Sequence, residues 1–156
     1  KNPFHMIGKE WMLVTSGTES KSNTMTASWG GLGIMWNKNV ASIVLRPQRY
    51  TKEFIDAGDY FSLSFFGNDY KKELGYLGSV SGRDENKIEK SGLTLGFEDR
   101  IPFFREAKTV ILCKKLFAQE MKPESFIEQS LLQKNYPNKD YHTVYIAEIK
   151  KVMVTK

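Results

Sequence analysis

Alternation of apolar and polar side chains along the chain predicts a protein built mainly from β-strands. In residues 60–66, YFSLSFF, large apolar residues alternate with serines, as in a strand with one large apolar face and one small face. Residues 40–46, VASIVLR, form a second clear strand, with Ala41, Ile43 and Leu45 on one face and Ser42, Val44 and Arg46 on the other. Further strands are expected at residues 10–16, Thr24 to Trp29, residues 93–98, residues 108–121 and residues 142–154.

Short helices are expected between these strands. Thr51 is the predicted N-cap of a helix, TKEFIDA, that stops at Gly58, and Asn68 or Asp69 opens a second helix. Residues 81–91 form a turn and a short third helix, and a polar, helix-prone segment runs from Pro123 to about Lys134. Because strands outnumber helices and the helices lie between hairpin-like pairs, we expect a mainly β protein. Its predicted form is a closed antiparallel sheet with helical insertions rather than a doubly wound parallel sheet.

The composition indicates one domain over residues 1–156, since neither a repeat nor a linker divides the chain. Aromatic residues make up 13% of it, which suggests a well-filled core, a site for a flat ligand, or both. Cys113 is the single cysteine, so no internal disulfide can form, and no apolar run is long enough to span a bilayer. No secretory signal is visible, and we expect a cytoplasmic protein without a membrane partner.

A net charge of +5 is compatible with nucleic acid, anionic lipid or a phosphorylated small molecule as partner. The lysines are spread along the chain without a polybasic block, which favours a solvated, mildly cationic surface. A basic β-barrel that binds single-stranded nucleic acid is the less favoured alternative, because no basic stripe is interleaved with aromatic residues.

Several familiar sites do not occur in the sequence. A dinucleotide fingerprint starting at Gly31 would need glycine where Trp36 stands, and neither a phosphate loop nor zinc-ligand spacing is found. Cys113 lies inside an apolar strand, where a buried, inert thiol is expected rather than a nucleophile. His142, at a strand start, is interpreted as a turn or interface residue, with a general base as the alternative. No metal site and no catalytic residue is assigned.

Two segments have the character of anion sites. In RPQRYT, residues 46–51, two arginines and the start of a helix converge, which combines charge, forked donors and free backbone N–H groups. In SGRDENK, residues 81–87, Ser81 and Gly82 let the backbone approach a ligand while Arg83 and Lys87 add charge. Taken singly, each segment fits ordinary surface cations and a helix start as well.

A third segment, SNTMTASWGGLG at residues 22–33, supplies the complement. Its small residues let the backbone approach a flat ring, and Met25 and Trp29 can cover the apolar faces of that ring. Taken alone, the segment is better explained by a strand that packs Trp29 into the core before a turn made by Gly30, Gly31 and Gly33. Together with the two anion sites, it predicts a flat, phosphorylated ligand.

At this point the chain resembles a known family. NTMTASWG, RPQRYT, SGRDENK and YHTVYIAEI, in order from about Pro3 to Val154, are similar to the flavin reductase-like, FMN-binding split-barrel proteins of the flavoredoxin type. The resemblance implies an antiparallel split β-barrel and a homodimer with FMN near the interface. It also implies the cofactor-binding residues: Asn23, Thr24, Met25, Thr26, Ala27, Ser28 and Trp29 along the isoalloxazine, Arg46, Arg49, Tyr50 and Thr51 at the phosphate and ribityl end, and Ser81, Gly82, Arg83 and Lys87 completing the pocket.

The resemblance further implies an NAD(P)H-dependent flavin reductase or flavoredoxin-type oxidoreductase, in which nicotinamide passes hydride to flavin N5. Trp29 or Trp36 would supply the stacking surface, the latter from across a dimer interface. Because Ser79 and Val80 precede SGR, no cysteine is expected beside the flavin there. The alternative is an FMN electron carrier that docks a redox protein without catalysis.

Overall fold

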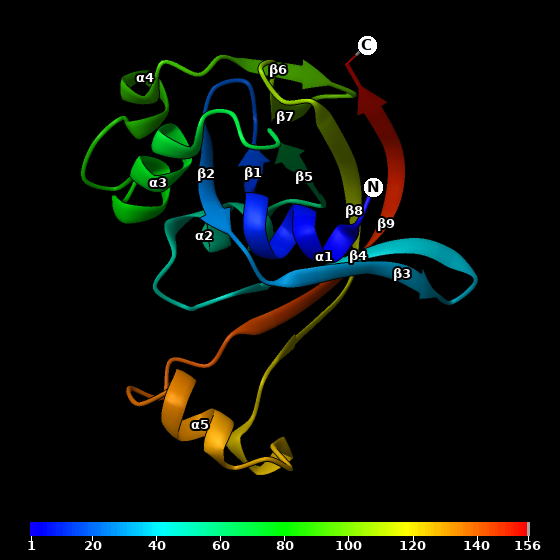
Figure 1. The fold of residues 1–156 in the computed structure, drawn as a ribbon, viewed down its shortest axis with the longest axis vertical. Helices are drawn as coiled ribbons and strands as arrows, with labels where there is room; N and C mark the ends of the chain where they lie inside the picture. The colour runs from blue at the N-terminus through cyan, green and yellow to red at the C-terminus, as the bar shows by residue number, and fades with distance from the viewer. Residues whose placement is uncertain (156) are drawn as a thin grey trace.

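The computed structural model describes residues 1–155, and Figure 1 shows that strands dominate them. The strands are β1 Met12–Gly17, β2 Ser22–Ala27, β3 Gly30–Met35, β4 Lys38–Leu45, β5 Tyr60–Phe65, β6 Leu95–Glu98, β7 Ile101–Phe104, β8 Thr109–Glu120 and β9 Thr143–Val154. The helices are α1 Pro3–His5, α2 Tyr50–Ala57, α3 Lys71–Ser79, α4 Lys87–Ser91 and α5 Ser130–Asn135, with a π-helical turn η1 Met6–Glu10 and a 3-10 turn η2 Pro123–Ser125.

Seven strands form one antiparallel sheet in the order β2-β1-β5-β8-β9-β4-β3. Its two edge strands, β2 and β3, follow each other in the chain and are joined by Ser28 and Trp29 alone. A two-residue link between opposite edges requires the sheet to curl until the edges meet, although β2 and β3 do not pair with each other. The result is a split β-barrel, which confirms the predicted fold (Figure 1).

The predicted alternation places the apolar faces inside the barrel. Ile43 and Leu45 of β4 and Phe61 and Leu63 of β5 are buried in one core with the apolar side chains of β1, β8 and β9. The serines of β5 point the other way, where the Ser62 hydroxyl donates to the Pro102 carbonyl at 2.6 Å. Both faces predicted for residues 40–46 and 60–66 are therefore confirmed.

A second core covers the outside of β1, β5 and β8. Leu74 and Leu77 of α3 and Phe104 of β7 pack there against Leu13 and Leu112. Figure 1 shows α3 and α4 beside β2, and the β6–β7 hairpin lying across one end of the sheet. These layers hold β2 and the loop after α3 in fixed positions, and both contribute to the site described below.

The end of β8 and the segment that follows it leave the barrel as an arm, which we define as residues 118–142. Register shifts between Leu112 and Cys113 and between Lys115 and Phe117 interrupt the β8–β9 ladder. Such bulges bend a strand pair and increase its twist. The arm carries η2 and α5 away from the barrel body (Figure 1).

The predicted glycine turn is wrong, because Gly30, Gly31 and Gly33 belong to strand β3. The chain reverses instead at Trp36 and Asn37, whose φ angles of 53° and 57° are those of a two-residue hairpin turn. Gly30 is needed for a different reason. Its φ is 151°, and a Cβ atom there would lie 2.4 Å from the Ser42 carbonyl oxygen.

Several element boundaries also differ from the predictions. Helix α2 starts one residue earlier than expected, so Thr51 is inside the helix and Arg49 occupies the N-cap position without a side-chain cap. Helix α3 starts at Lys71, after Tyr70 in a left-handed conformation, and not at Asn68 or Asp69. The first strand starts at Met12, and Trp29 lies beyond the end of β2. The helical residues Pro3–Glu10 and strand β7 have no counterpart in the sequence-based assignment.

Replacing Gly30 with alanine should destabilise the barrel, because the new methyl group would collide with backbone that cannot move independently. We expect Gly30→Ala to lower the free energy of unfolding by about 2 kcal/mol or more. Gly33→Ala is the matched control in the same strand, since a Cβ at Gly33 meets nothing within 4 Å. Urea unfolding measures both variants, and equal midpoints would contradict the steric role of Gly30.

Candidate cofactor-binding site

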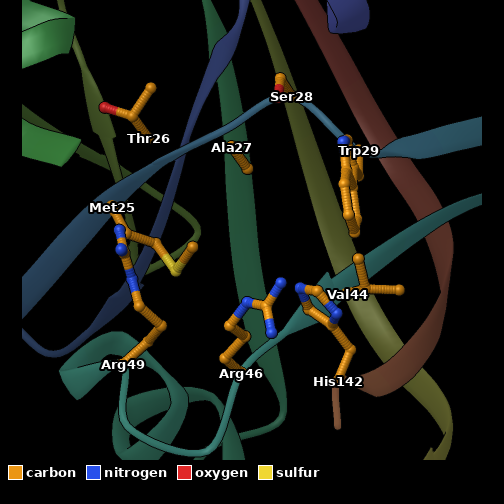
Figure 2. A pocket seen from close by; sticks show the side chains of 9 residues that line it. All are labelled: Met25, Thr26, Ala27, Ser28, Trp29, Val44, Arg46, Arg49 and His142. Carbon is orange, nitrogen blue, oxygen red and sulfur yellow. The ribbon is translucent and has the colours of Figure 1, made fainter. Parts of the chain in front are cut away.

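Two adjoining cavities lie where β2 faces the end of β4. The first, of about 280 Å³, is lined by Met25, Thr26, Ala27, Ser28, Trp29, Val44, Arg46, Arg49 and His142 (Figure 2). The second, of about 210 Å³, is lined by Asn23, Met25, Gln48, Arg49, Tyr50, Thr51, Gly78, Ser79, Val80, Ser81 and Lys87. Met25 and Arg49 line both, so the cavities form one elongated site.

Strand alternation explains how the first cavity gets its walls. Ile43 and Leu45 point into the barrel, so Val44 and Arg46 point outward toward β2 and its continuation. Figure 2 shows Met25 to Trp29 along one side, with Arg46, Val44 and His142 opposite. The sequence analysis assigned Arg46 to the site but not Val44, although strand alternation places both residues on the same face.

His142 is the main site residue that the sequence left unassigned. It is 7% exposed, its Nδ1 atom lies 2.6 Å from the Tyr136 hydroxyl, and its ring lies 5.2 Å from that of Trp29. Burial, followed by the nearby Arg46 charge, lowers the pKa of His142 to about 4. The imidazole is therefore neutral near pH 7 and contributes hydrogen bonding and ring contact rather than charge.

Arg46 lines the first cavity, but its guanidinium already binds residues of the arm. Its guanidinium donates to the Asn135 carbonyl at 3.0 Å and forms an ion pair with Asp140 at 3.2 Å. The same group lies over the Tyr136 ring, 5.0 Å from its centre. Arg46 therefore fixes the arm beside the cavity, and its charge is largely neutralised by Asp140.

The second cavity is built around the start of α2. Thr51, buried in the first turn, accepts a hydrogen bond of 2.8 Å from the Asn23 side-chain amide of β2. No side chain caps the helix, so its first backbone N–H groups are left for a ligand. The hydrogen bond between Asn23 and Thr51 joins residues 22–33 to residues 46–51, which the sequence shows only as separate motifs.

Arg49 lies at the junction of the two cavities and has no intramolecular partner. Within residues 1–155 its guanidinium makes neither a hydrogen bond nor an ion pair, and burial lowers its pKa. An arginine stays charged in proteins even so, and it carries five donors. This combination of a half-buried cation and unused donors is the strongest indication of an anionic ligand.

Lys87 adds a second cation to the second cavity. It is 3% exposed, and its Nζ atom donates to the carbonyls of Leu77 at 2.9 Å and Val80 at 3.0 Å. Burial first, and then repulsion by Arg49, lowers the pKa of Lys87 to about 8. Neither cavity has a carboxylate in its lining, so the two cations are balanced by no acidic side chain within the site.

Three predicted residues lie outside both cavities. Thr24 is fully buried, with its hydroxyl 2.9 Å from that of Thr15 and bonded to the Val14 carbonyl. Arg83 pairs with Glu53 and donates to the Gln48 carbonyl, while its guanidinium lies over the Tyr50 ring. Gly82 lies against Asn23, because a Cβ atom added at Gly82 would be 2.1 Å from the Asn23 Oδ1 atom. Thr24 therefore supports the site. Gly82 and Arg83 instead line a neighbouring cavity of about 770 Å³, whose lining also includes Asn23, Tyr50 and Lys87 of the second cavity.

Two further residues considered from the sequence also lie apart from the site. Burial raises the pKa of the Cys113 thiol to about 12, which fits the predicted inert thiol. Trp36 packs against Phe117 with ring centres 6.2 Å apart and lines neither cavity. Within residues 1–155 no three metal-binding side chains gather. None of the helices there has the length and apolar character that crossing a membrane requires.

Comparison with known proteins decides the family. The family model described as the flavin reductase like domain matches residues 4–156. The chain belongs to this family. The resemblance drawn from the sequence motifs is thereby confirmed.

Solved structures with the same fold agree. Flavoredoxin of Desulfovibrio vulgaris (Miyazaki F) is 24% identical, with a TM-score of 0.72 over 94% of this chain and 69% of that one. An FMN-binding protein from Thermus thermophilus is 20% identical, with a TM-score of 0.73 over 98% and 75%. A Shewanella frigidimarina protein described as having a split barrel domain is 16% identical, with a TM-score of 0.74 over 99% and 73%. At these identities the likeness establishes the fold.

One curated relative also matches. An uncharacterized protein of Archaeoglobus fulgidus is 29% identical over 104 residues, which cover 65% of this chain and 58% of that protein. The chain thus spans less than two thirds of the length of this relative.

Proposed function

We propose that the chain binds FMN across the two cavities, with the isoalloxazine in the first and the phosphate in the second. The observation that carries this proposal is Arg49, a half-buried and unpaired cation placed where the cavities meet. Together the cavities reach the roughly 300–1,000 Å³ that small-molecule sites occupy. The FMN-binding protein of Thermus thermophilus, which has the same fold, supports the same ligand.

The residues present fit the chemistry of that cofactor. Arg49, Lys87 and the uncapped N-terminus of α2 would hold the phosphate by charge and by backbone N–H groups. Met25 and Trp29 would cover the apolar ring, and Arg46, whose charge Asp140 largely balances, is a further residue in the lining of the first cavity. The bound flavin itself would supply the redox chemistry, while the protein orients it and tunes its electrostatics.

We further propose that the chain acts as an NAD(P)H-dependent flavin reductase or flavoredoxin-type oxidoreductase in the cytoplasm. Trp29, 47% exposed at the rim of the first cavity, offers a surface on which a nicotinamide ring can stack. His142, which is neutral near pH 7, lies beside the Trp29 ring and adds no charge to this side of the cavity. Cys113 is buried in the barrel core and lines neither cavity, so we propose a reaction that uses no thiol. A second copy of the chain and a nicotinamide or redox protein are the partners proposed, rather than nucleic acid or a membrane.

The phosphate role of Arg49 is tested by comparing FMN with riboflavin, which has no phosphate. Loss of one charge-assisted contact of about 1.5–3 kcal/mol should weaken FMN binding by Arg49→Ala roughly 10- to 150-fold. Riboflavin binding should change little. Both dissociation constants can be measured from the quenching of flavin fluorescence.

Lys151→Ala is the control, because Lys151 pairs with Glu98 and lines none of the cavities around the site. A surface pair of this kind should alter the FMN dissociation constant by less than about fivefold. Equal weakening of FMN and riboflavin by Arg49→Ala would remove Arg49 from the phosphate site. Failure of the wild-type chain to retain flavin on gel filtration would contradict FMN binding itself.

An FMN electron carrier without catalysis is the second candidate, because the exposed Trp29 could equally face a protein partner. Addition of NADH, or of NADPH, to the FMN-loaded chain under argon separates the two functions. A reductase should lose its visible flavin absorbance with at least one of the two nucleotides. Unchanged absorbance with both, together with rapid electron exchange with a redox protein, would favour the carrier.

We also propose a homodimer, supported by an exposed apolar cluster on the β3–β4 hairpin and β8. Its members are Ile34, Met35, Trp36, Leu116 and Phe117. Contiguous exposed apolar patches of this kind mark interfaces. Sedimentation velocity should show a dimer that Phe117→Glu converts to a monomer. The control Ile127→Glu, at a fully exposed position outside the cluster, should remain a dimer, and a wild-type monomer would contradict the proposal.

A further inference from the structure

A third cavity lies on the other side of Trp29, between the N-terminal helical residues and β3. It has a volume of about 420 Å³ and is lined by Pro3, Phe4, Ile7, Gly8, Ser28, Trp29, Gly30, Gly31 and Leu32. None of these residues is ionisable. The cavity therefore differs in character from the two cationic cavities of the cofactor site.

The third cavity adjoins the proposed flavin cavity. Ser28 and Trp29 line both cavities. A molecule in the third cavity would therefore lie beside the same two residues as the occupant of the first. This adjacency follows from the corner where β2 passes into β3.

The lining restricts the class of ligand that can bind. A charged molecule would lose hydration without meeting an opposite charge, so a neutral one is favoured. Phe4, which is 86% exposed, and Trp29 offer aromatic surface suited to a flat apolar ring. The Ser28 hydroxyl makes no hydrogen bond within residues 1–155, so it can donate to one oxygen of a ligand.

We propose that this cavity binds a neutral, flat, apolar molecule carrying a carbonyl group, such as a quinone. The role of this molecule as an electron acceptor rests on the proposed function, whereas its binding to the cavity does not. In the net reaction, reduced nicotinamide, a quinone and one proton give oxidised nicotinamide and a hydroquinone. The position beside Trp29 would place this acceptor next to the flavin cavity without sharing its cationic end.

Glycine at position 8 allows the cavity to be filled selectively. A Cβ atom at Gly8 meets nothing within 4 Å, so the side chain of Gly8→Leu starts in open space at the cavity wall. Gly75 of α3 is the matched control, since a Cβ there also meets nothing within 4 Å and Gly75 lines none of the three cavities. Phe4→Ala removes an exposed ring and gives a second variant with little risk to folding.

Titration calorimetry with 1,4-naphthoquinone, in the presence and absence of FMN, tests the proposal. Gly8→Leu should weaken naphthoquinone binding at least about tenfold, and Phe4→Ala should weaken it about threefold or more. Gly75→Leu should bind naphthoquinone like the wild type. All three variants should keep the wild-type affinity for FMN.

Naphthoquinone that does not bind the wild type would overturn the proposal, and so would naphthoquinone that binds Gly8→Leu as tightly as it binds the wild type. A change in the sedimentation coefficient of Gly8→Leu would also overturn it, by showing that a second copy of the chain covers the cavity. Loss of FMN binding with intact, Gly8-dependent naphthoquinone binding would instead contradict the proposed function alone. The two proposals therefore fail in distinguishable ways.

Discussion

The corner formed by Ser28 and Trp29 is the constraint on which the rest of the structure depends. It joins the two edges of one sheet, and a sheet whose edges are two residues apart has to curl into a barrel. Gly30 completes the corner, because its positive φ and missing side chain let β3 pass against the Ser42 carbonyl of β4. Since β4 lies beside β3, the same corner brings the end of β2 opposite Arg46 and the start of α2. The cofactor site is thus a consequence of how the barrel closes.

Charge in this site is set by which cations the fold neutralises. Arg46 and Arg83 are both paired with carboxylates, on the arm and on α2, and Lys87 donates to two carbonyls of the loop after α3. Arg49 alone among these four residues has no partner in the described chain. The other three position the arm, the helix and the loop around it. A site for an anion is strongest where the surroundings supply cations but leave one of them uncompensated.

The fold could be predicted from the sequence because strand alternation is a local property, clear in residues 40–46 and 60–66. Strand β3 escaped prediction since three of its first four residues are glycines, which leave no apolar pattern to detect. The cofactor segments were likewise recognisable as motifs. What the motifs did not contain was the partner of each side chain: Glu53 for Arg83, Asp140 for Arg46 and Thr15 for Thr24 are long-range or cross-strand contacts. His142 was considered but not assigned to the site, because its place there comes from Tyr136 and Trp29 and not from its neighbours in sequence.

The glycines of residues 30–33 explain why Trp29 can serve two cavities. Glycine in a strand costs stability, because the residue contributes no side chain to packing and loses more backbone freedom on folding. In β3 that cost is accompanied by open space beside Gly31 and Leu32, into which no neighbouring side chain extends far enough to fill the third cavity. A Cβ atom at Gly31 would lie 3.4 Å from the Ser42 hydroxyl oxygen, which is ordinary van der Waals contact. Trp29 therefore lines two cavities, with 47% of its surface exposed, instead of being packed into the core.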